Sequence, residues 1–448
     1  MDNKAIIAIF AVVCIIIVAA AAFMLLNNSG SSDSGDHKGD VASPTGRLVV
    51  YGNANNDDYI DKNDVDYINS IISGKVTWNQ KNNKYADANL DGKIDDSDVK
   101  LVQKIINRES VDISYDEFHF ARADHPRDNA VVTNTIKYPV KCDTIAVGYY
   151  EVGYLMTILG LWDKVKYVDE NTSGHYMDYP SKDLPIIGNF KTIDADAIHN
   201  SGVDVFIGYG TYQKQAREDL RAMHSPTQVI EIQGQGIDCL SEVVTMGFLL
   251  DANKNARKWI DFYDKTMDKI NDAVKDILPQ NYNSYYVLKG ANDANATNLT
   301  IHAQGSDRSY PDLQWILELP AQNFGKGDTY QISNLDVDYF VNHPSDYLIW
   351  SFTGNQARDC PAAIQTFPEF LKGTQAYENG NIIGFAYTMF NSYYGVGMLL
   401  YLAGMLYPGQ IDMDDAYQTL VDYYNQFHYY GYSEDNKNFL VYKWEPKA

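Results

Sequence analysis

"DVFIGYGTYQKQAREDLRAM", residues 204–223, indicates the fold class of this 448-residue chain. A short apolar stretch of strand type leads through a very short connection into a stretch of helical character. The same order recurs, since "TIAVG" (144–148) leads into "YYEVGYLMTILG" and "QVIEI" (228–232) precedes "CLSEVVTMGFLL". Strands followed by helices over short connections predict a parallel α/β sheet.

A long amphipathic stretch follows this first set of strands. "NKNARKWIDFYDKTMDKINDAVKDIL", residues 253–278, carries apolar residues at helical spacing and is closed by Pro279. After it the strand pattern resumes with "YYVL", "YLIW" and "IIGFA". We therefore expect a domain over 111–448 with two Rossmann-like lobes, an N-lobe at about 130–252 and a C-lobe at 283–448, joined by one long helix.

Two acidic loops stand ahead of this domain, "NANNDDYIDKND" (53–64) and "DANLDGKIDDSD" (87–98). Each places oxygen-bearing side chains at positions 1, 3, 5, 9 and 12, as Ca²⁺ loops do, because this hard cation takes six to eight oxygen ligands. The alternative is a pair of solvated acidic turns. The first loop has Asp58 where the second has Gly92, so we expect its calcium to be held less tightly. The ten predicted calcium ligands are Asn53, Asn55, Asp57, Asp61, Asp64, Asp87, Asn89, Asp91, Asp95 and Asp98.

Each loop runs into an apolar helical pattern, and the unit is duplicated. Residues 47–110 thereby resemble a type I dockerin, a small all-α module that binds two Ca²⁺ and docks onto cohesin domains. The resemblance implies a cohesin-bearing partner. The positions that read this partner in the family are occupied here by Lys62, Asn63, Asp96 and Ser97.

The N-terminal region reads as a membrane segment and a tether. Residues 5–26 are apolar and uncharged, and at about 1.5 Å per residue they are long enough to span a bilayer. We expect residues 1–26 to form a transmembrane signal anchor and 27–46 a flexible linker, with the large domain outside the cell. The alternative is a signal peptide cleaved near Asn27.

Charge and cysteine usage restrict the partners. The formal net charge of −23 argues against nucleic acid, which requires a basic surface. Cys142, Cys239 and Cys360 lie far apart, and a domain above about 300 residues needs no disulfide framework, so we predict none.

Two longer stretches extend the interpretation, "DLPIIGNFKTIDADAIHNSGVDVFIGYG" (183–210) and "AYENGNIIGFAYTMFNSYYGVGMLLYLAGMLYP" (376–408). Their order and spacing resemble the helical-backbone, class III substrate-binding proteins of ABC importers for iron-siderophores, haem and cobalamin. The resemblance implies a permease and an ATPase as partners. It also implies an acidic residue on each lobe that pairs with a permease arginine, here Asp196 and Asp338. The alternative is that each carboxylate stabilises a helix N-terminus.

The ligand site is expected where the parallel strands end. Tyrosines dominate these positions, and a tyrosine offers a flat apolar face with a hydroxyl, which suits a planar or chelated ligand. A tyrosine that merely covers the acidic surface is the alternative for each. His302 and Arg308 are added as polar contacts. The candidate ligand-binding residues are Tyr149, Tyr150, Asn189, Tyr209, Tyr212, His302, Arg308 and Tyr387, with Phe190, Gln233, Asn292, Ser351, Phe352 and Met389 beside them.

These residues lead to a functional expectation. We expect capture of a metal chelate, an iron-siderophore first and haem or a corrinoid next, ahead of a bare metal ion because no histidines cluster. No nucleophile elbow, phosphate loop or paired catalytic carboxylates are found, so we do not expect an enzyme. Two alternatives remain, a cell-surface scaffold or adhesion component displayed through its dockerin, and an enzyme docked to a polysaccharide-degrading complex.

Overall fold

The structure is a computed structural model. It describes residues 46–445 except 81–82, 120–130, 174–180, 182, 211, 290–298, 303–313, 326–330, 354–358, 367 and 435–440. The predicted membrane segment, nearly all of the predicted linker, and the candidates Asn292 and Arg308 lie outside the described residues.

The expectation of a single-pass membrane protein is corrected by the structure. Within the described ranges, no helix combines the length and the apolar character that a membrane span requires. The 22-residue helix α9 (Asn253–Val274) is long enough, but lysine, arginine and aspartate side chains recur along it. Such charged side chains are costly inside a bilayer, and this helix instead buries one stripe of apolar residues against the protein.

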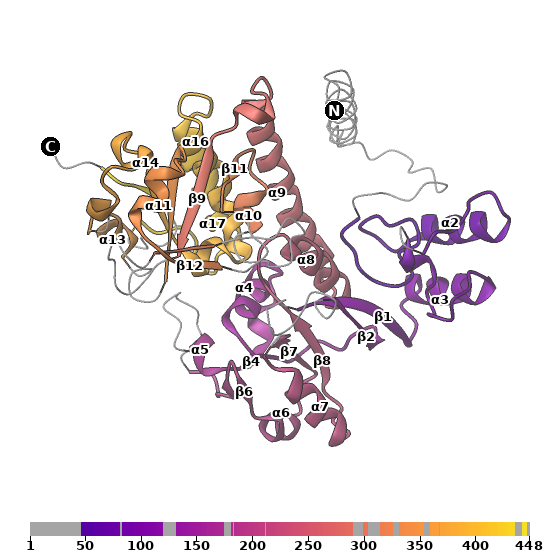
Figure 1. Ribbon diagram of the computed structural model, residues 1–448. Helices are drawn as coiled ribbons and strands as arrows, with labels where there is room; N and C mark the ends of the chain where they lie inside the picture. The colour runs from indigo at the N-terminus through magenta and orange to yellow at the C-terminus, as the bar shows by residue number, and fades with distance from the viewer. Residues whose placement is uncertain are drawn as a thin grey trace. The chain divides into compact units, whose positions relative to one another are not determined.

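The calcium-loop segment, residues 47–110, is built on two short helices, α2 (Lys62–Ile72) and α3 (Asp96–Ile106), which pack against each other (Figure 1). Asp61 and Asp95 cap them, and each N-terminus closes as a capping box. The short helix η1 (Lys84–Ala86) precedes the second loop.

The calcium-loop segment is attached to the rest of the chain by Leu48, Val50 and Ile105, which belong to the main apolar core, and by polar contacts. Arg47 holds Asp264 of α9 with N–O distances of 2.6 and 3.0 Å, and Arg257 of α9 holds Asp58 at 3.0 Å. Asp58 is the residue that replaces glycine in the first loop, so its side chain has a structural use there.

The N-lobe contains a parallel sheet in the order β4-β3-β7-β8. The central strands β3 and β7 are buried along their whole length, as the predicted strand–helix alternation requires, whereas the edge strand β4 exposes Lys166. A hairpin of β1 (Val111–Phe118) and β2 (Val131–Tyr138) precedes the sheet, and β1 contacts β8. The other N-lobe elements are β3 (Ile145–Val147), α4 (Tyr150–Ile158), η3 (Trp162–Lys164), β4 (Val165–Val168), α5 (Glu170–Ser173), β5 (Gly188–Asn189), β6 (Thr192–Ile193), α6 (Ala195–Ser201), β7 (Val205–Tyr209), α7 (Lys214–Ala222), β8 (Gln228–Ile232) and α8 (Asp238–Leu249).

The C-lobe sheet has the order β12-β10-β9-β13-β14-β15, with β11 beside β9. Strands β9, β13 and β14 are parallel, while β10, β12 and β15 run antiparallel to their neighbours. The C-lobe elements are η4 (Pro279–Asn281), β9 (Ser284–Lys289), β10 (Leu299–His302), α10 (Gln314–Leu317), β11 (Gln322–Asn323), β12 (Gln331–Leu335), α11 (Val337–Asn342), β13 (Tyr347–Phe352), α13 (Cys360–Thr366), η5 (Pro368–Leu371), α14 (Gln375–Glu378), β14 (Ile382–Ala386), α15 (Tyr387–Phe390), η6 (Tyr393–Met398), α16 (Leu399–Leu406), α17 (Met413–Phe427) and β15 (Tyr442–Lys443).

The two lobes repeat one local device. Asp204, ahead of β7, accepts hydrogen bonds from the backbone N–H and the hydroxyl of Thr144, ahead of β3. Asp346, ahead of β13, accepts the same pair of bonds from Ser284 at the start of β9. In each lobe the aspartate therefore ties together the beginnings of two neighbouring parallel strands.

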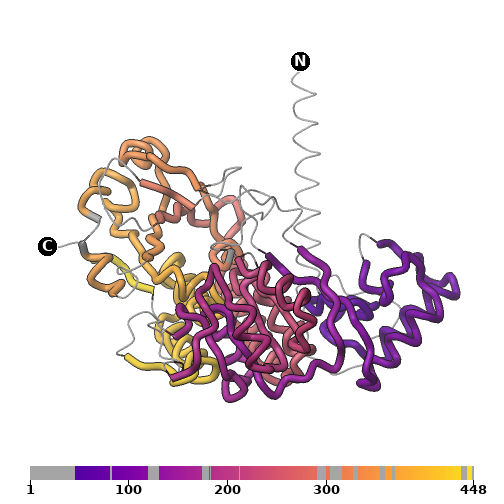
Figure 2. The backbone as a smooth tube through the Cα atoms, turned by 90° about the horizontal axis from the view of Figure 1, so that it is seen from below, coloured from indigo at the N-terminus to yellow at the C-terminus, as the bar shows by residue number. Residues whose placement is uncertain are grey.

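Helix α9 joins the lobes and ends at Val274, four residues before the predicted end at residue 278. It packs against α8 on the N-lobe side and α16 on the C-lobe side. The buried Trp259 contacts the rings of Trp315 and Tyr393 and donates a hydrogen bond of 2.7 Å to the hydroxyl of Tyr423. The last helices of the chain thus return beside the N-lobe, which Figure 2 shows as yellow next to magenta.

Candidate functional site

An aromatic platform lies at the carboxyl edge of the N-lobe sheet. We use this name for Tyr149, Tyr150, Phe190, Tyr209 and Tyr212, whose rings form a continuous set. The centroid of Tyr149 lies 4.2 Å from that of Tyr150, 5.4 Å from Phe190 and 4.7 Å from Tyr209. Tyr212 stacks on Tyr209 at 5.5 Å. The sequence nominated these residues one by one, and the structure brings them together.

Gln213, which the sequence analysis missed, holds the platform in place. Its buried side-chain amide donates to the carbonyls of Gly148 and Phe190 at 2.7 and 3.1 Å, and its oxygen accepts from the Tyr209 N–H at 2.9 Å. A Cβ at Gly148 would stand 2.2 Å from the Gln213 oxygen, so a larger residue there would displace this side chain. Three separate segments, namely the residue after β3, the turn between β5 and β6 and the end of β7, are therefore hydrogen-bonded to one side chain.

The hydroxyl of Tyr209 is fixed from the other side. It accepts from the side-chain amides of Gln233 at 2.8 Å and Gln235 at 3.1 Å. Tyr209 is buried, whereas Tyr149, Phe190 and Tyr212 are only half-buried. The half-buried rings are those that can still present an apolar face to a ligand.

On the C-lobe, His302 and Tyr387 come together with ring centroids 6.0 Å apart and nearly parallel planes. His302 is buried, and this burial, assisted by the charge of Lys289, lowers its pKa to about 3. The imidazole is therefore neutral at physiological pH. Tyr387 is half-buried and is the more accessible of the two for a ligand.

The other C-lobe candidates at the strand ends are buried. Ser351 and Phe352 end β13 with no exposed surface, and Met389 is equally enclosed. The Met389 sulfur accepts from the hydroxyl of Tyr154, 3.9 Å away on helix α4 of the N-lobe. These residues therefore pack the interior.

Buried hydrogen bonds connect the loop after β8 to the C-lobe. Glu242 of α8 accepts from the N–H groups of Gln233 and Gly234 and, at 2.7 Å, from the hydroxyl of Tyr393 in η6. Burial raises the pKa of Glu242 to about 7, although these hydrogen bonds act in the opposite direction. The carboxylate thus links the loop beside the platform to the second lobe.

Three further candidates lie on the periphery. Asn189 caps the turn between β5 and β6, where its side-chain oxygen accepts from the N–H groups of Lys191 and Thr192. Asp196 and Asp338 are exposed in the first turns of α6 and α11, at equivalent positions of the two lobes. The helix N-caps are Asp194 and Asp336, while Asp196 and Asp338 lie in the first turns, where a carboxylate also stabilises the helix dipole.

The two acidic loops fit the donor set that Ca²⁺ requires. Asp64 and Asp98 are completely buried and accept backbone N–H bonds from their own loops. Within the described part of the chain, no lysine or arginine forms an ion pair with a predicted calcium ligand. Buried carboxylates need a compensating cation, and these loops hold the oxygens that a calcium ion takes.

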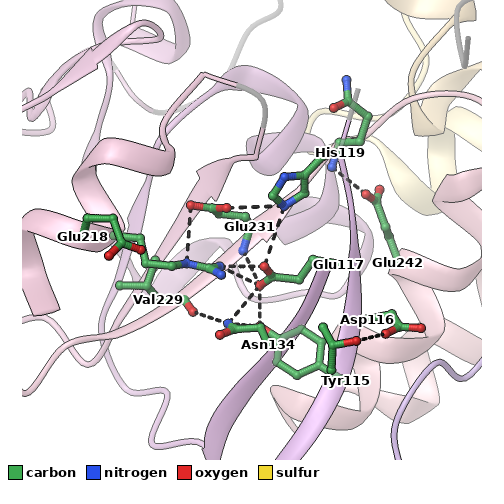
Figure 3. Close-up of polar contacts among 12 residues, drawn as sticks. Tyr115, Asp116, Glu117, His119, Asn134, Glu218, Val229, Glu231 and Glu242 are labelled. Atoms are coloured by element: carbon green, nitrogen blue, oxygen red, sulfur yellow. Dashed lines mark hydrogen bonds and ion pairs between the residues drawn. The ribbon is translucent and has the colours of Figure 1, made fainter. Parts of the chain in front are cut away.

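A polar cluster at the junction of β1 and β8 was also missed by the sequence analysis (Figure 3). Arg217 of α7 donates to both oxygens of Glu117 at 2.7 Å, and its Nε lies 3.4 Å from Glu231. Burial alone would raise the pKa of Glu117, but His119 and Arg217 outweigh it and lower this pKa to about 2. Burial raises the pKa of Glu231 to about 7. A glutamate inside the apolar strand "QVIEI" was the sequence signal that could have revealed the cluster.

Comparisons with solved structures place the fold. A TroA-like periplasmic binding protein, FepB of Veillonella parvula, aligns with 13% identity and a TM-score of 0.56 over 73% of this chain and 100% of that chain. The molybdate periplasmic binding protein MolA of Haemophilus influenzae, solved with molybdate, aligns with 10% identity and a TM-score of 0.52 over 67% and 97%. An ABC transporter solute binding protein of Sulfurospirillum deleyianum gives 12% and 0.52 over 69% and 96%.

This likeness confirms the α/β fold of a two-lobed periplasmic binding protein. No protein-family model matches the chain, and the search of curated proteins finds no match.

Proposed function

We propose that this chain is the solute-binding component of an ABC importer and that it captures a metal chelate, an iron-siderophore first and haem or a corrinoid next. The aromatic platform is the observation that carries the proposal. Three half-buried rings stand on a rigid edge where parallel strands end, and flat apolar faces suit a large planar or chelated ligand. The fold is shared with the periplasmic binding protein FepB and with the molybdate periplasmic binding protein MolA.

Binding is proposed to need little rearrangement. Gln213 fixes three loops of the platform, and Glu242 ties the adjoining loop to the C-lobe. Helix α9 and the hydrogen bond from Trp259 to Tyr423 hold both lobes. A largely preformed site gains affinity from aromatic contact because little order must be created on binding.

Tyrosine replacement tests the platform. Tyr212→Ala removes a half-buried ring stacked on Tyr209 and should weaken chelate binding by about 1–2 kcal/mol, roughly five- to thirtyfold. The assay is tryptophan quenching during titration with ferric siderophores, haem and cobalamin. Tyr429→Ala, which changes an exposed tyrosine elsewhere, is the control. Equal affinities in all three proteins would exclude the platform as the binding surface.

Delivery to a permease is proposed to use Asp196 and Asp338, exposed at equivalent positions of the two lobes. Asp196→Ala with Asp338→Ala should leave chelate affinity unchanged and lower ligand uptake in cells that express the cognate permease and ATPase. The N-cap variant Asp336→Asn is the control for helix stability. Undiminished uptake by the double variant would refute this role.

A second function is proposed for the calcium-loop segment, which we infer binds two Ca²⁺ and docks onto a cohesin-bearing protein. The specific observation is that Lys62, Asp96 and Ser97, three of the partner-reading positions, are exposed. Binding to an isolated cohesin domain, present with calcium and abolished by a chelator, is the expected calorimetric result. A protein that bound cohesin but no chelate would fit the scaffold alternative instead.

A further inference from the structure

We propose that Glu117, His119 and Glu231 form a binding site for a divalent transition metal, with zinc as the favoured ion. The site is separate from the calcium loops and from the aromatic platform. It joins the end of β1 to β8, two elements far apart in sequence. The proposal does not depend on which solute the protein binds.

The three side chains already converge. Figure 3 shows the His119 ring pointing toward the carboxylates of Glu117 and Glu231. Its Nε2 lies 3.4 Å from Glu231 Oε2 and 3.8 Å from Glu117 Oε2, and one ligand atom from each residue falls within 4.8 Å of the others. A tetrahedral zinc ion with bonds of about 2.0–2.1 Å separates its ligand atoms by roughly 3.3 Å. Small side-chain movements would therefore complete the site.

The ligand atoms are buried. Glu117 and Glu231 are each 2% exposed, and among the described residues His119 Nε2 makes no hydrogen bond. Glu231 Oε1 lies 3.4 Å from Arg217 Nε, which leaves Oε2 as the oxygen that faces His119. Arg217 supplies one positive charge for two buried carboxylates. Without a metal the cluster of one arginine and two carboxylates carries a net charge of −1, and a divalent cation beside His119 would change it to +1. Imidazole nitrogen and carboxylate oxygen are ligands that zinc accepts.

Residues around Glu117 and His119 hold these proposed ligands in position, as the residues that surround the ligands of a metal site do. The Glu117 Oε1 atom accepts from the Tyr115 hydroxyl at 2.6 Å and from the Glu231 N–H at 2.9 Å. Oε2 is the oxygen nearer to His119, and it also accepts from Arg217 at 2.7 Å. The His119 ring lies so close to Gly210 that a Cβ there would be 2.7 Å from it. Glycine at the end of β7 thus makes room for the imidazole.

The proposed metal site lies beside the end of strand β7, which carries Tyr209 of the platform. Gly210 follows Tyr209 of the platform, and its N–H donates to the carbonyl of Ile232, next to Glu231. An ion at Glu117, His119 and Glu231 would fasten the β1 hairpin to the edge that carries the platform. The ion would therefore stabilise this edge without touching a ligand held by the half-buried rings.

The experiment uses the full-length protein, stripped by chelator and refilled with excess calcium so that the acidic loops are occupied. Zinc is titrated in competition with a chromogenic chelator, and cobalt is added separately to record its visible spectrum. We expect one zinc per chain and the intense visible absorption of tetrahedral cobalt. His119→Gln and Glu231→Gln should each lower zinc affinity by more than about 100-fold, since even outer-shell losses cost 10- to 100-fold.

His343→Gln, which changes the exposed histidine that follows α11, is the matched control and should bind zinc as the wild type does. Tyr115→Phe provides a milder variant with all three ligands intact and should lower zinc affinity by about tenfold. Circular dichroism reports whether each variant is folded. Absence of zinc binding by the wild type, or equal binding by a folded His119→Gln variant, would overturn the proposal. Either result would make the cluster an ion-pair network of Glu117, Glu231 and Arg217.

Discussion

The hydrogen bond from Tyr393 to Glu242 gives a prediction about how the lobes are held together. Tyr393→Phe removes only the hydroxyl that donates to Glu242 at 2.7 Å, and both residues are buried. Hydrogen bonds to charged groups contribute about 1.5–3 kcal/mol and those between neutral groups about 1 kcal/mol. The loss should therefore depend on whether Glu242 is ionised.

The pH dependence follows from the raised pKa of Glu242, about 7 against an ordinary value of 4.5. The folded state binds more protons than the unfolded state between these values, so this group lowers stability as the pH rises through that window. Above it the carboxylate is charged, and Tyr393→Phe should cost about 1.5–3 kcal/mol. At pH 5.5, where the acid is mostly protonated, the cost should fall to about 1 kcal/mol.

The assay is urea unfolding followed by tryptophan fluorescence at pH 5.5 and pH 8.5, with calcium present throughout. Tyr285→Phe is the control because the hydroxyl of this equally buried tyrosine lies 3.5 Å from its acceptor, the carbonyl of Ile316. It should cost less and show no pH dependence. A Tyr393→Phe cost below about 0.5 kcal/mol at pH 8.5, or equal at both pH values, would refute the reasoning.

Two further predictions concern the calcium-loop segment. Arg257→Ala and Asp58→Ala should each lower the free energy of unfolding by about 1 kcal/mol, because the ion pair between these residues is partly buried. The double variant should be no less stable than either single variant. Additive losses of stability in urea unfolding would contradict a direct contact between the two side chains. Asp57→Ala and Asp91→Ala should each abolish one of two calcium-binding events in calorimetry, with the first loop the weaker, and two unchanged events in either variant would reject the ligand assignment.

Much of the fold could be predicted from local sequence patterns. The apolar runs that end at Gly148 and Gly210 predicted the parallel strands β3 and β7, and helical spacing predicted α9. The end of α9 was misplaced by four residues because apolar spacing continues beyond Val274, where the chain turns before Pro279. The expectation of a single-pass membrane protein was wrong, since no helix among the described residues is long and apolar enough to cross a membrane.

Only part of the candidate site could be predicted from the sequence. The rule that ligands bind at strand ends nominated Tyr149, Tyr209 and Tyr212, which the structure brings together. Gln213 was missed because its role depends on three loops that approach one another only in the folded chain. The Glu117–Arg217 pair joins residues 100 positions apart, and no local sequence pattern predicts such a contact.

Native mass spectrometry tests the central claim most directly. The protein, loaded with calcium, is incubated with equal amounts of ferric siderophores, haem and cobalamin and then transferred to the gas phase intact. The proposed function predicts one dominant 1:1 complex whose added mass equals that of a single chelate and which is depleted in Tyr212→Ala. A spectrum that shows only the protein with bound metal ions, at every chelate concentration tried, would contradict the claim.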